Sequence, residues 1–429
     1  MQFMIKWGLR LIPALALAMP AFTPAFAQLR QATLSDSQEP GSVLVFPFFI
    51  GGRSASGAQV NVDGAMLPRT EIEVGAVCPA TATIAACQEH TTVKVRAHWV
   101  CPGSQDLTTK AVCEETSFEF FLTINGKVAF AADGTAPFSQ AFGGTVPLRV
   151  AAPQCKNGYL IAWVVNNGNQ PIKFDGLIGD AVVRGPTMVA STSVNGGFST
   201  AVSAYPAIPI QANTASLSGD VLNTGATAQF PGGTELILDG TPGLPGVAGT
   251  GTYQRVTQWL FGDVKFDNEA PAHAGPPTPA NAFNDTFLIF LTLDVDSGLS
   301  NAPTFVPLQF FNESKQPPSA TDPSFENPID DTFEFLCWGR FKLSDFNDNL
   351  TQANMGTRKG LFIAGPATKG SSPFVVPEPG DTSDATLLRL VMTVEGTAVN
   401  SYQERSYIFV PYNNSLGVDT EFEFEAIND

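Results

Sequence analysis

The chain has few of the residues on which hydrolytic and metal chemistry depend. Only three of its 429 residues are histidines, and it contains no G-x-S-x-G, H-E-x-x-H or C-x-x-C pattern. A serine or cysteine nucleophile needs a base beside it, and a zinc site needs a set of nitrogen, sulfur or carboxylate ligands. Of His90, His98 and His273, the second belongs to an alternating strand pattern and the third to a proline-rich segment. The sequence therefore favours neither a histidine-dependent triad nor a zinc enzyme.

Charged residues are also scarce, at 15% of the chain, and positive charge is the scarcer sign. The 23 Lys and Arg against 40 Asp and Glu leave a formal net charge of −17. This charge repels phosphate backbones and anionic membrane surfaces, so we expect no nucleic-acid partner. The 44% of hydrophobic residues is too large a share for a disordered chain. Its abundant Val, Ile, Thr and Phe, with 39 Gly and 33 Pro, predict many short strands joined by turns.

The chain lacks long apolar runs apart from its first residues, where residues 1–27 have the pattern of a signal peptide. Lys6 and Arg10 precede an apolar stretch at 11–22, and Ala25-Phe26-Ala27 places small residues at the two positions that a signal peptidase requires. Prolines interrupt the apolar stretch, and it is shorter than the roughly 18 to 20 residues of a spanning helix. We expect a secreted protein, periplasmic or extracellular, with no membrane span after cleavage.

Six cysteines, most of them in one region, favour disulfide bonds in an exported protein over metal ligation. Cys101 and Cys113 flank a polar loop between two strand-like runs, as a hairpin cross-link would. Cys78 and Cys87 bracket a second short loop. The remaining Cys155 and Cys337 either pair across domains or stay as buried thiols. Six cysteines allow 15 connectivities, and the sequence does not choose among them.

Alternation of apolar and polar residues predicts antiparallel strands at 70–74, 93–100 and 117–124. Near-continuous apolar runs at 43–50 and 158–165 predict central strands, with Pro47 marking an edge or a bulge. Helical periodicity is almost absent. The fold class is therefore all-β.

The second half of the chain repeats this order of strands. Four segments of the first half have counterparts of similar sequence in the second. The pairs are 70–74 with 286–291, 93–99 with 305–311, 117–123 with 332–338, and 157–162 with 359–364. We interpret this as two tandem antiparallel β-sandwich domains at 28–215 and 253–429, derived from a divergent internal duplication. Chance likeness between apolar strands is the alternative. A Gly- and Pro-rich linker or long loop at 216–252 separates the two.

One calcium site is conceivable from the sequence. Asp345, Asn347 and Asn349 occupy the first, third and fifth positions of an oxygen-ligand loop, with Asp348 between the last two. An EF-hand would continue with Gly and Glu, but the chain has Leu350 and Gly356 at those positions. Because Asp and Asn also populate ordinary turns, a turn explains the segment more simply. No other cofactor is expected.

A polysaccharide hydrolase with paired carboxylates stays open, since 40 acidic residues contain some suitable pair. The aromatic residues speak against it, because sugar platforms use exposed Trp and Tyr. Trp99, Trp163, Trp259 and Trp338 all fall in strand-like runs, and we expect each of them in the core. The acidic strand pattern at 420–429 fits a protected edge strand, or a donor strand for a neighbouring subunit in a surface layer or filament.

The segments G-S-V-L-V-F-P-F-F (41–49) and F-D-G-L-I-G-D-A-V (174–182) resemble a pattern in exported bacterial β-rich proteins of unassigned function. The resemblance covers part of the first half and implies export and a β fold, with no catalytic residues. We therefore expect an exported, non-enzymatic protein with a structural, cell-surface or binding role, whose cell-surface or matrix partner the sequence does not identify.

Overall fold

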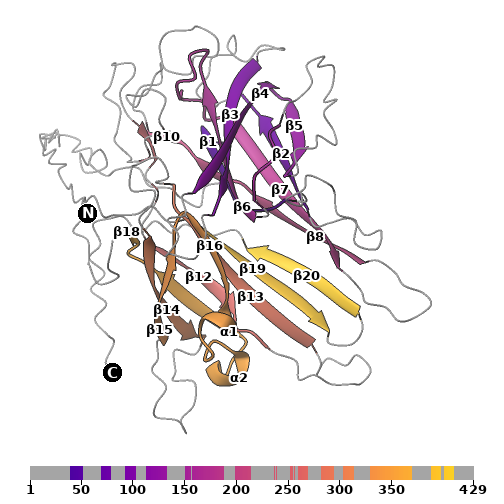
Figure 1. Cartoon of the computed structure of the whole chain (residues 1–429), viewed down its shortest axis with the longest axis vertical. Coiled ribbons are helices and arrows are strands. Elements are labelled where there is room, and N and C mark those ends of the chain that lie inside the picture. Colours follow the sequence, from indigo (N-terminus) through magenta and orange to yellow (C-terminus); the bar gives the residue numbers. More distant parts are fainter. Residues whose placement is uncertain are drawn as a thin grey trace, which may run out of the picture. The chain divides into compact units, whose positions relative to one another are not determined.

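The computed structural model describes residues 39–51, 69–78, 92–102, 113–132, 150–155, 157–187, 199–213, 236, 238, 252–254, 256, 259–268, 282–293, 303–313, 329–369, 388–397 and 401–409. These residues form an all-β fold of antiparallel sheets (Figure 1), as the sequence predicts. All of them belong to one compact unit, residues 31–429. The expected signal peptide at 1–27 lies outside the described residues.

The first sandwich consists of two sheets with the strand orders β4-β3-β6-β1-β9 and β5-β2-β7-β8. Its strands are β1 (Val43–Ile50), β2 (Arg69–Ala76), β3 (Thr92–Cys101), β4 (Glu114–Thr123), β5 (Lys127–Ala131), β6 (Asn157–Val165), β7 (Leu177–Thr187), β8 (Ser199–Pro206) and β9 (Ile208–Ile210). Side chains of both sheets share one core, in which the rings of Trp99 and Phe130 lie 6.0 Å apart. Phe49 packs edge-on against Trp99 in the same core.

The sequence pattern of these strands explains how they sit. In β3, Val95, Ala97 and Trp99 are fully buried while the charged residues between them are partly exposed, as the alternation predicts. The apolar strand β1 lies inside its sheet, between β6 and β9. Its register with β6 shifts between Phe46 and Phe49. Pro47 therefore marks a bulge rather than an edge, because a proline cannot donate to the ladder.

The second sandwich has the sheet orders β12-β17-β14-β15, with β18 beside β14, and β16-β13-β19-β20. Its elements are β12 (Leu260–Lys265), β13 (Ala282–Leu291), β14 (Thr304–Asn312), β15 (Ile329–Phe335), β16 (Trp338–Lys342), α1 (Leu343–Phe346), α2 (Gln352–Met355), β17 (Lys359–Ala364), β18 (Thr368–Lys369), β19 (Leu388–Thr397) and β20 (Ser401–Phe409). Its core is rich in phenylalanine, and Phe290 of one sheet packs against Phe362 of the other. The sequence does not reveal the two short helices, since one turn is too short for a helical period.

The second sandwich repeats the strand order of the first. Replacing β4-β3-β6-β1 by β15-β14-β17-β12, and β5-β2-β7-β8 by β16-β13-β19-β20, reproduces both sheets. The four sequence echoes fall on these equivalent strands. Two echoes are out of register. Buried Val95 and Ala97 correspond to buried Val306 and Leu308, so Val93 matches Thr304 and not Phe305. The echo at 332–338 is displaced by two residues, since Phe118 lies opposite Ala97 and Asp331 opposite Leu308. A slip of one residue exchanges the two faces of a strand.

The chain passes from one core to the other between Val256 and Leu260. A short pair of strands, β10 (Ala212–Asn213) and β11 (Thr252–Tyr253), precedes this point, and Tyr253 and Val256 are buried in the first core. Leu260 belongs to the second core. Most of the Gly- and Pro-rich segment 216–252 lies outside the described residues.

Three of the four tryptophans expected in the core are buried, namely Trp99, Trp163 and Trp338. The prediction is wrong for Trp259, which is 36% exposed just before β12. Neither helix in the described part of the chain has the length that crossing a membrane requires.

Candidate functional site

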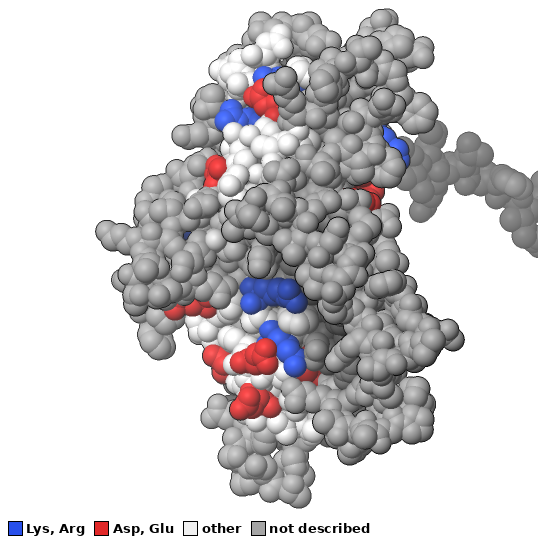
Figure 2. Space-filling view, turned by 45° about the vertical axis from the view of Figure 1, so that its right-hand side comes forward, with Lys and Arg blue, Asp and Glu red and all other residues white. Residues whose placement is uncertain are grey.

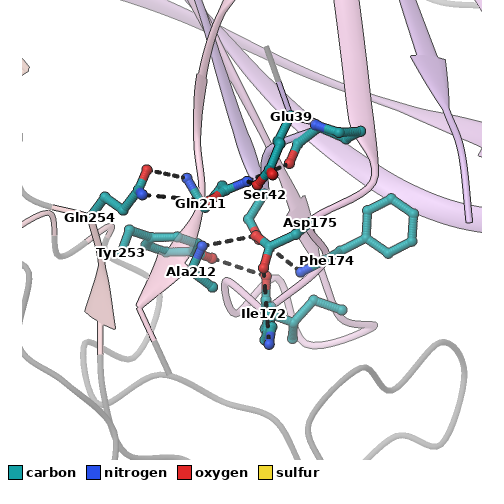
Figure 3. A network of polar contacts seen from close by, with 11 residues as sticks. Glu39, Ser42, Ile172, Phe174, Asp175, Gln211, Ala212, Tyr253 and Gln254 are labelled. Atoms are coloured by element: carbon teal, nitrogen blue, oxygen red, sulfur yellow. Dashed lines mark hydrogen bonds and ion pairs between the residues drawn. The ribbon is translucent and has the colours of Figure 1, made fainter. Parts of the chain in front are cut away.

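A network of polar contacts gathers around Ser42 and Asp175 in the first sandwich (Figure 3). Ser42 is fully buried at the start of β1. Its hydroxyl donates to Asp175 Oδ1 at 2.7 Å and accepts from the Phe174 N–H at 2.8 Å. Asp175 Oδ1 also accepts from the Ala212 N–H at 2.8 Å. The buried Lys173 ammonium lies 3.9 Å from the other carboxylate oxygen.

This network brings together two segments that lie far apart in the sequence. Residues 41–49 supply Ser42, residues 174–182 supply Asp175, and Gly41 and Leu177 exchange backbone hydrogen bonds beside them. A Cβ on Gly41 would lie 2.8 Å from the Ile210 nitrogen, which explains the glycine there. These two segments therefore form a structural joint in the first sandwich.

Two further segments complete the joint. The buried Tyr253 hydroxyl donates to the Ile172 carbonyl at 3.0 Å, and burial raises the pKa of Tyr253 well above its usual value, with the Asp175 carboxylate adding to the rise. Gln211 and Gln254 bond to each other, and the Gln211 amide donates to Glu39 Oε2 at 2.9 Å (Figure 3). A serine beside an aspartate is part of a nucleophilic relay, but this hydroxyl is buried, and His98, the histidine that the structure describes, makes its contacts elsewhere. The network therefore serves the fold.

His98 is the one histidine among the described residues, and its surroundings are also closed. Nε2 accepts from Arg96 Nε at 3.1 Å, which places the imidazole proton on Nδ1, 3.0 Å from Glu115 Oε2. Its ring packs against Trp163 with centroids 4.7 Å apart. Both nitrogens are engaged, so His98 is a satisfied histidine and not a general base. His90 and His273 lie outside the described residues.

The residues of the calcium prediction lie in and after α1. Asn347 Oδ1 accepts from the Asn349 N–H at 3.0 Å, and Asn347 Nδ2 donates to Asp331 Oδ2 at 3.4 Å. The Asp348 carbonyl accepts from the Asn354 amide. These contacts are those of an Asx turn. Within the described ranges no three His, Cys, Asp or Glu side chains form a metal-binding group. Calcium binding by Asp345, Asn347, Asp348 and Asn349 stays a prediction.

The cysteines pair differently from the expected hairpin cross-link. Cys101 bonds to Cys155, and Cys113 bonds to Cys337 across 224 residues. Cys101 and Cys113 thus form disulfides, but not with each other. The reason is that Cys113 lies at the start of β4 near the turn between β15 and β16, which carries Cys337. Cys78 is disulfide-bonded as well, while Cys87 lies outside the described residues.

Side chains around the Cys113–Cys337 bond join the two sandwiches. Trp338 Nε1 donates to the Pro47 carbonyl at 2.9 Å, and its ring stacks on Phe48 at 6.2 Å. The Tyr159 hydroxyl donates to the Thr292 carbonyl at 3.0 Å. The sequence left a cross-domain bond of Cys337 open but named Cys155 as its partner, because sequence patterns report which residues are buried and not against which distant strand.

Arg340 lies at the same junction without an acidic partner in the described part of the chain. Its guanidinium carbon is 3.9 Å from the centroid of the Phe287 ring, and burial lowers the pKa of Arg340. A cation over aromatic rings is stabilised by the ring quadrupole. On the face in Figure 2, described acidic and basic side chains lie next to each other rather than in one field of a single sign.

Comparisons with known proteins add little to this geometry. No protein-family model matches the chain, and no curated protein sequence matches it significantly. Among solved structures, the viral chemokine binding protein R17 encoded by rodent gammaherpesvirus Peru is 10% identical over 89% of this chain and 88% of that one, with a TM-score of 0.11. A TM-score this low carries no argument about fold or function.

Proposed function

We propose that this chain is an exported, non-enzymatic protein with a structural, cell-surface or binding role. The observation that carries the proposal is that each of the five described cysteines is disulfide-bonded. Structural disulfides form in oxidising compartments and are rare in the cytosol. The signal-peptide pattern at 1–27 supports the same location.

The polar groups argue for a role without catalysis. Two carboxylates, the buried Asp267 and the partly buried Asp175, accept hydrogen bonds from backbone amides. A general acid or base must instead reach the substrate. These carboxylates are used to hold the fold, which supports a binding or structural role over hydrolysis.

Export is tested by expressing the full chain in a bacterial host and separating cytoplasm, periplasm and medium. We expect mature protein in the periplasm or medium, with no free thiol on titration after denaturation. The matched variant Leu15→Arg/Leu17→Arg, which breaks the apolar stretch, should stay in the cytoplasm. Cytoplasmic protein with reactive thiols from the unchanged chain would refute export.

Catalysis is tested by incubating the purified mature chain with a panel of soluble and insoluble polysaccharides. We expect no release of reducing ends above that of the heat-denatured protein. Sustained release that scales with protein concentration would overturn the non-enzymatic proposal and favour a hydrolase with paired carboxylates.

A further inference from the structure

Arg340 is a charged residue set among apolar side chains. It lies on β16, the end strand of its sheet, directly opposite Ile289 of β13. Residues two apart in a strand, and residues opposite each other on neighbouring strands, share a face of the sheet. Arg340 therefore lies on the same face as Ile289, Leu291 and Trp338, which all belong to the first core.

Two aromatic rings flank the Arg340 guanidinium. Its central carbon lies 3.9 Å from the centroid of the Phe287 ring and 5.7 Å from that of the Phe48 ring. The Phe48 ring is fully buried and stacks on Trp338, whereas Phe287 and Arg340 are both partly exposed. A planar guanidinium held on a ring face presents its N–H groups at its edge. The side of the guanidinium next to Phe287 is therefore the one that solvent reaches.

No acidic side chain of the described residues balances the charge of Arg340. Its Nε is enclosed and donates to no acceptor in the same part of the chain, whereas the two terminal nitrogens are not enclosed in this way. Arginine keeps its charge in proteins, and an enclosed charge without a counter-charge is unfavourable. An anion on the two terminal nitrogens supplies that counter-charge.

The first sandwich shows that the repeated fold does not need a charge at this position. When the buried residues of β2 and β13 are matched, Glu73 takes the position of Ile289. The residues opposite these two are Ala129 and Arg340. In the first copy an alanine is thus sufficient, and the basic residue of that strand, Lys127, pairs with Glu73 at 2.8 Å. In the second copy the residue opposite the cation is an isoleucine, which offers no carboxylate.

We propose that Arg340 binds the carboxylate group of a small acid whose apolar body packs beside Phe287. The two terminal nitrogens match the two oxygens of a carboxylate, and the partly exposed ring accommodates a flat apolar group. A multiply charged phosphate fits less well, because the surroundings are apolar and the chain has a net charge of −17. The site gives a ligand class to the binding role of the proposed function, on which it rests.

Ligand-detected NMR with benzoate on the purified mature chain tests the site. The variant Arg340→Met removes the charge and keeps an apolar side chain, and Arg358→Met removes the same charge from an exposed position. We expect the unchanged chain and Arg358→Met to bind benzoate equally well, and Arg340→Met to bind it roughly tenfold more weakly or less. Uncharged benzamide should bind the unchanged chain no better than benzoate binds Arg340→Met, and phosphate should not displace benzoate.

Thermal unfolding separates ligand binding from a purely structural role of Arg340. Benzoate should raise the unfolding temperature of the unchanged chain and of Arg358→Met but not that of Arg340→Met, since a ligand stabilises only a fold that binds it. Arg340→Lys, which keeps the charge without the planar fork, should show a smaller rise. A lower unfolding temperature of Arg340→Met, with no effect of benzoate on any chain, would mean that Arg340 only joins the two sandwiches.

Three further results would overturn the proposal. They are equal benzoate affinity of the unchanged chain and Arg340→Met, displacement of benzoate by phosphate, and no binding of benzoate to the unchanged chain. Each of them leaves the fractionation and polysaccharide tests as they are, so this site can fail while the proposed function stands.

Discussion

The two sandwiches share a strand order but link their first and second strands through different side-chain hydrogen bonds. At the junction between the first and second strands, the Ile50 N–H of the first sandwich donates to Thr70 Oγ1 at 2.8 Å. In the second sandwich the equivalent Thr286 donates its own N–H to Asp267 Oδ1 at 2.5 Å. The equivalent threonine therefore accepts through its hydroxyl in the first copy and donates its backbone N–H to a carboxylate in the second.

Cross-links separate the two copies as well. The Cys101–Cys155 disulfide lies within the first sandwich and Cys113–Cys337 joins the two. No disulfide lies within the described part of the second sandwich. Its buried Asp267, at 1% exposure, instead ties β13, α1 and α2 together. The first copy is thus stabilised by covalent bonds and the second by a buried carboxylate.

The largest expected effect is that of removing the disulfide between the copies. In the chain-entropy model, closing a loop of 224 residues stabilises the fold by roughly 5 kcal/mol. Calorimetry of Cys113→Ala/Cys337→Ala should therefore show a lower unfolding temperature and two resolved transitions, one for each sandwich. The control Cys101→Ala/Cys155→Ala should destabilise the first sandwich. A single transition at the original temperature in the first variant would show that the two copies do not depend on this bond.

A smaller effect is expected from the buried carboxylate. Asp267→Ala leaves the N–H groups of Thr286 and Ser344 without their acceptor, which should lower the free energy of unfolding by about 3 kcal/mol. Asp267→Asn keeps one carbonyl oxygen and should cost about half as much. Urea denaturation measures both, with the exposed Asp263→Ala as control. Equal midpoints for Asp267→Ala and Asp263→Ala would contradict the structural role of Asp267.

The smallest expected effect is a loss of stability at alkaline pH, which should be greater in the first sandwich because of its buried tyrosines. Burial raises the pKa values of Tyr205 and Tyr253, both in the first core, above the ordinary value of 10.0. The folded state favours the protonated hydroxyls. Their contribution to the free energy of unfolding is therefore complete below pH 10 and is lost as the pH rises above 10. For each tyrosine the free energy of unfolding should fall by about 1.4 kcal/mol per pH unit in that range.

Circular dichroism from pH 9 to 12 follows this loss, and the first sandwich should unfold before the second. Tyr205→Phe and Tyr253→Phe should each make the decline with pH less steep. An unchanged pH profile in both variants would mean that other groups govern alkaline unfolding.

Much of the fold can be read from the sequence because strand periodicity is a local property. The strands at 43–50 and 93–100 follow from spacing along the chain, whereas the sequence leaves Pro47 as an edge or a bulge and only the observed pairing of β1 with β6 and β9 decides for the bulge. Register is less secure, since the echo at 305–311 is displaced by one residue. The prediction for Trp259 is wrong because an apolar residue beside a strand indicates a core position even where the sheet face that it joins is only partly covered.

The contacts that define the candidate site could not be read in this way. Ser42 and Asp175 are 133 positions apart, and the sequence shows two similar segments without showing that they meet. The cysteine pairing fails for the same reason. Cys101 and Cys113 are close along the chain, but the sandwich brings each of them to a more distant cysteine.

The Cys113–Cys337 bond sets an order of events during synthesis. Cys337 is made 224 residues after its partner, so the Cys113 thiol must stay unpaired while the second sandwich is still being produced. Throughout that interval Cys101 competes for it from only a short distance along the chain. Early closure of Cys101 with Cys155 removes this competitor and keeps Cys113 available. The disulfide within the first sandwich thus forms before the one that joins the two sandwiches.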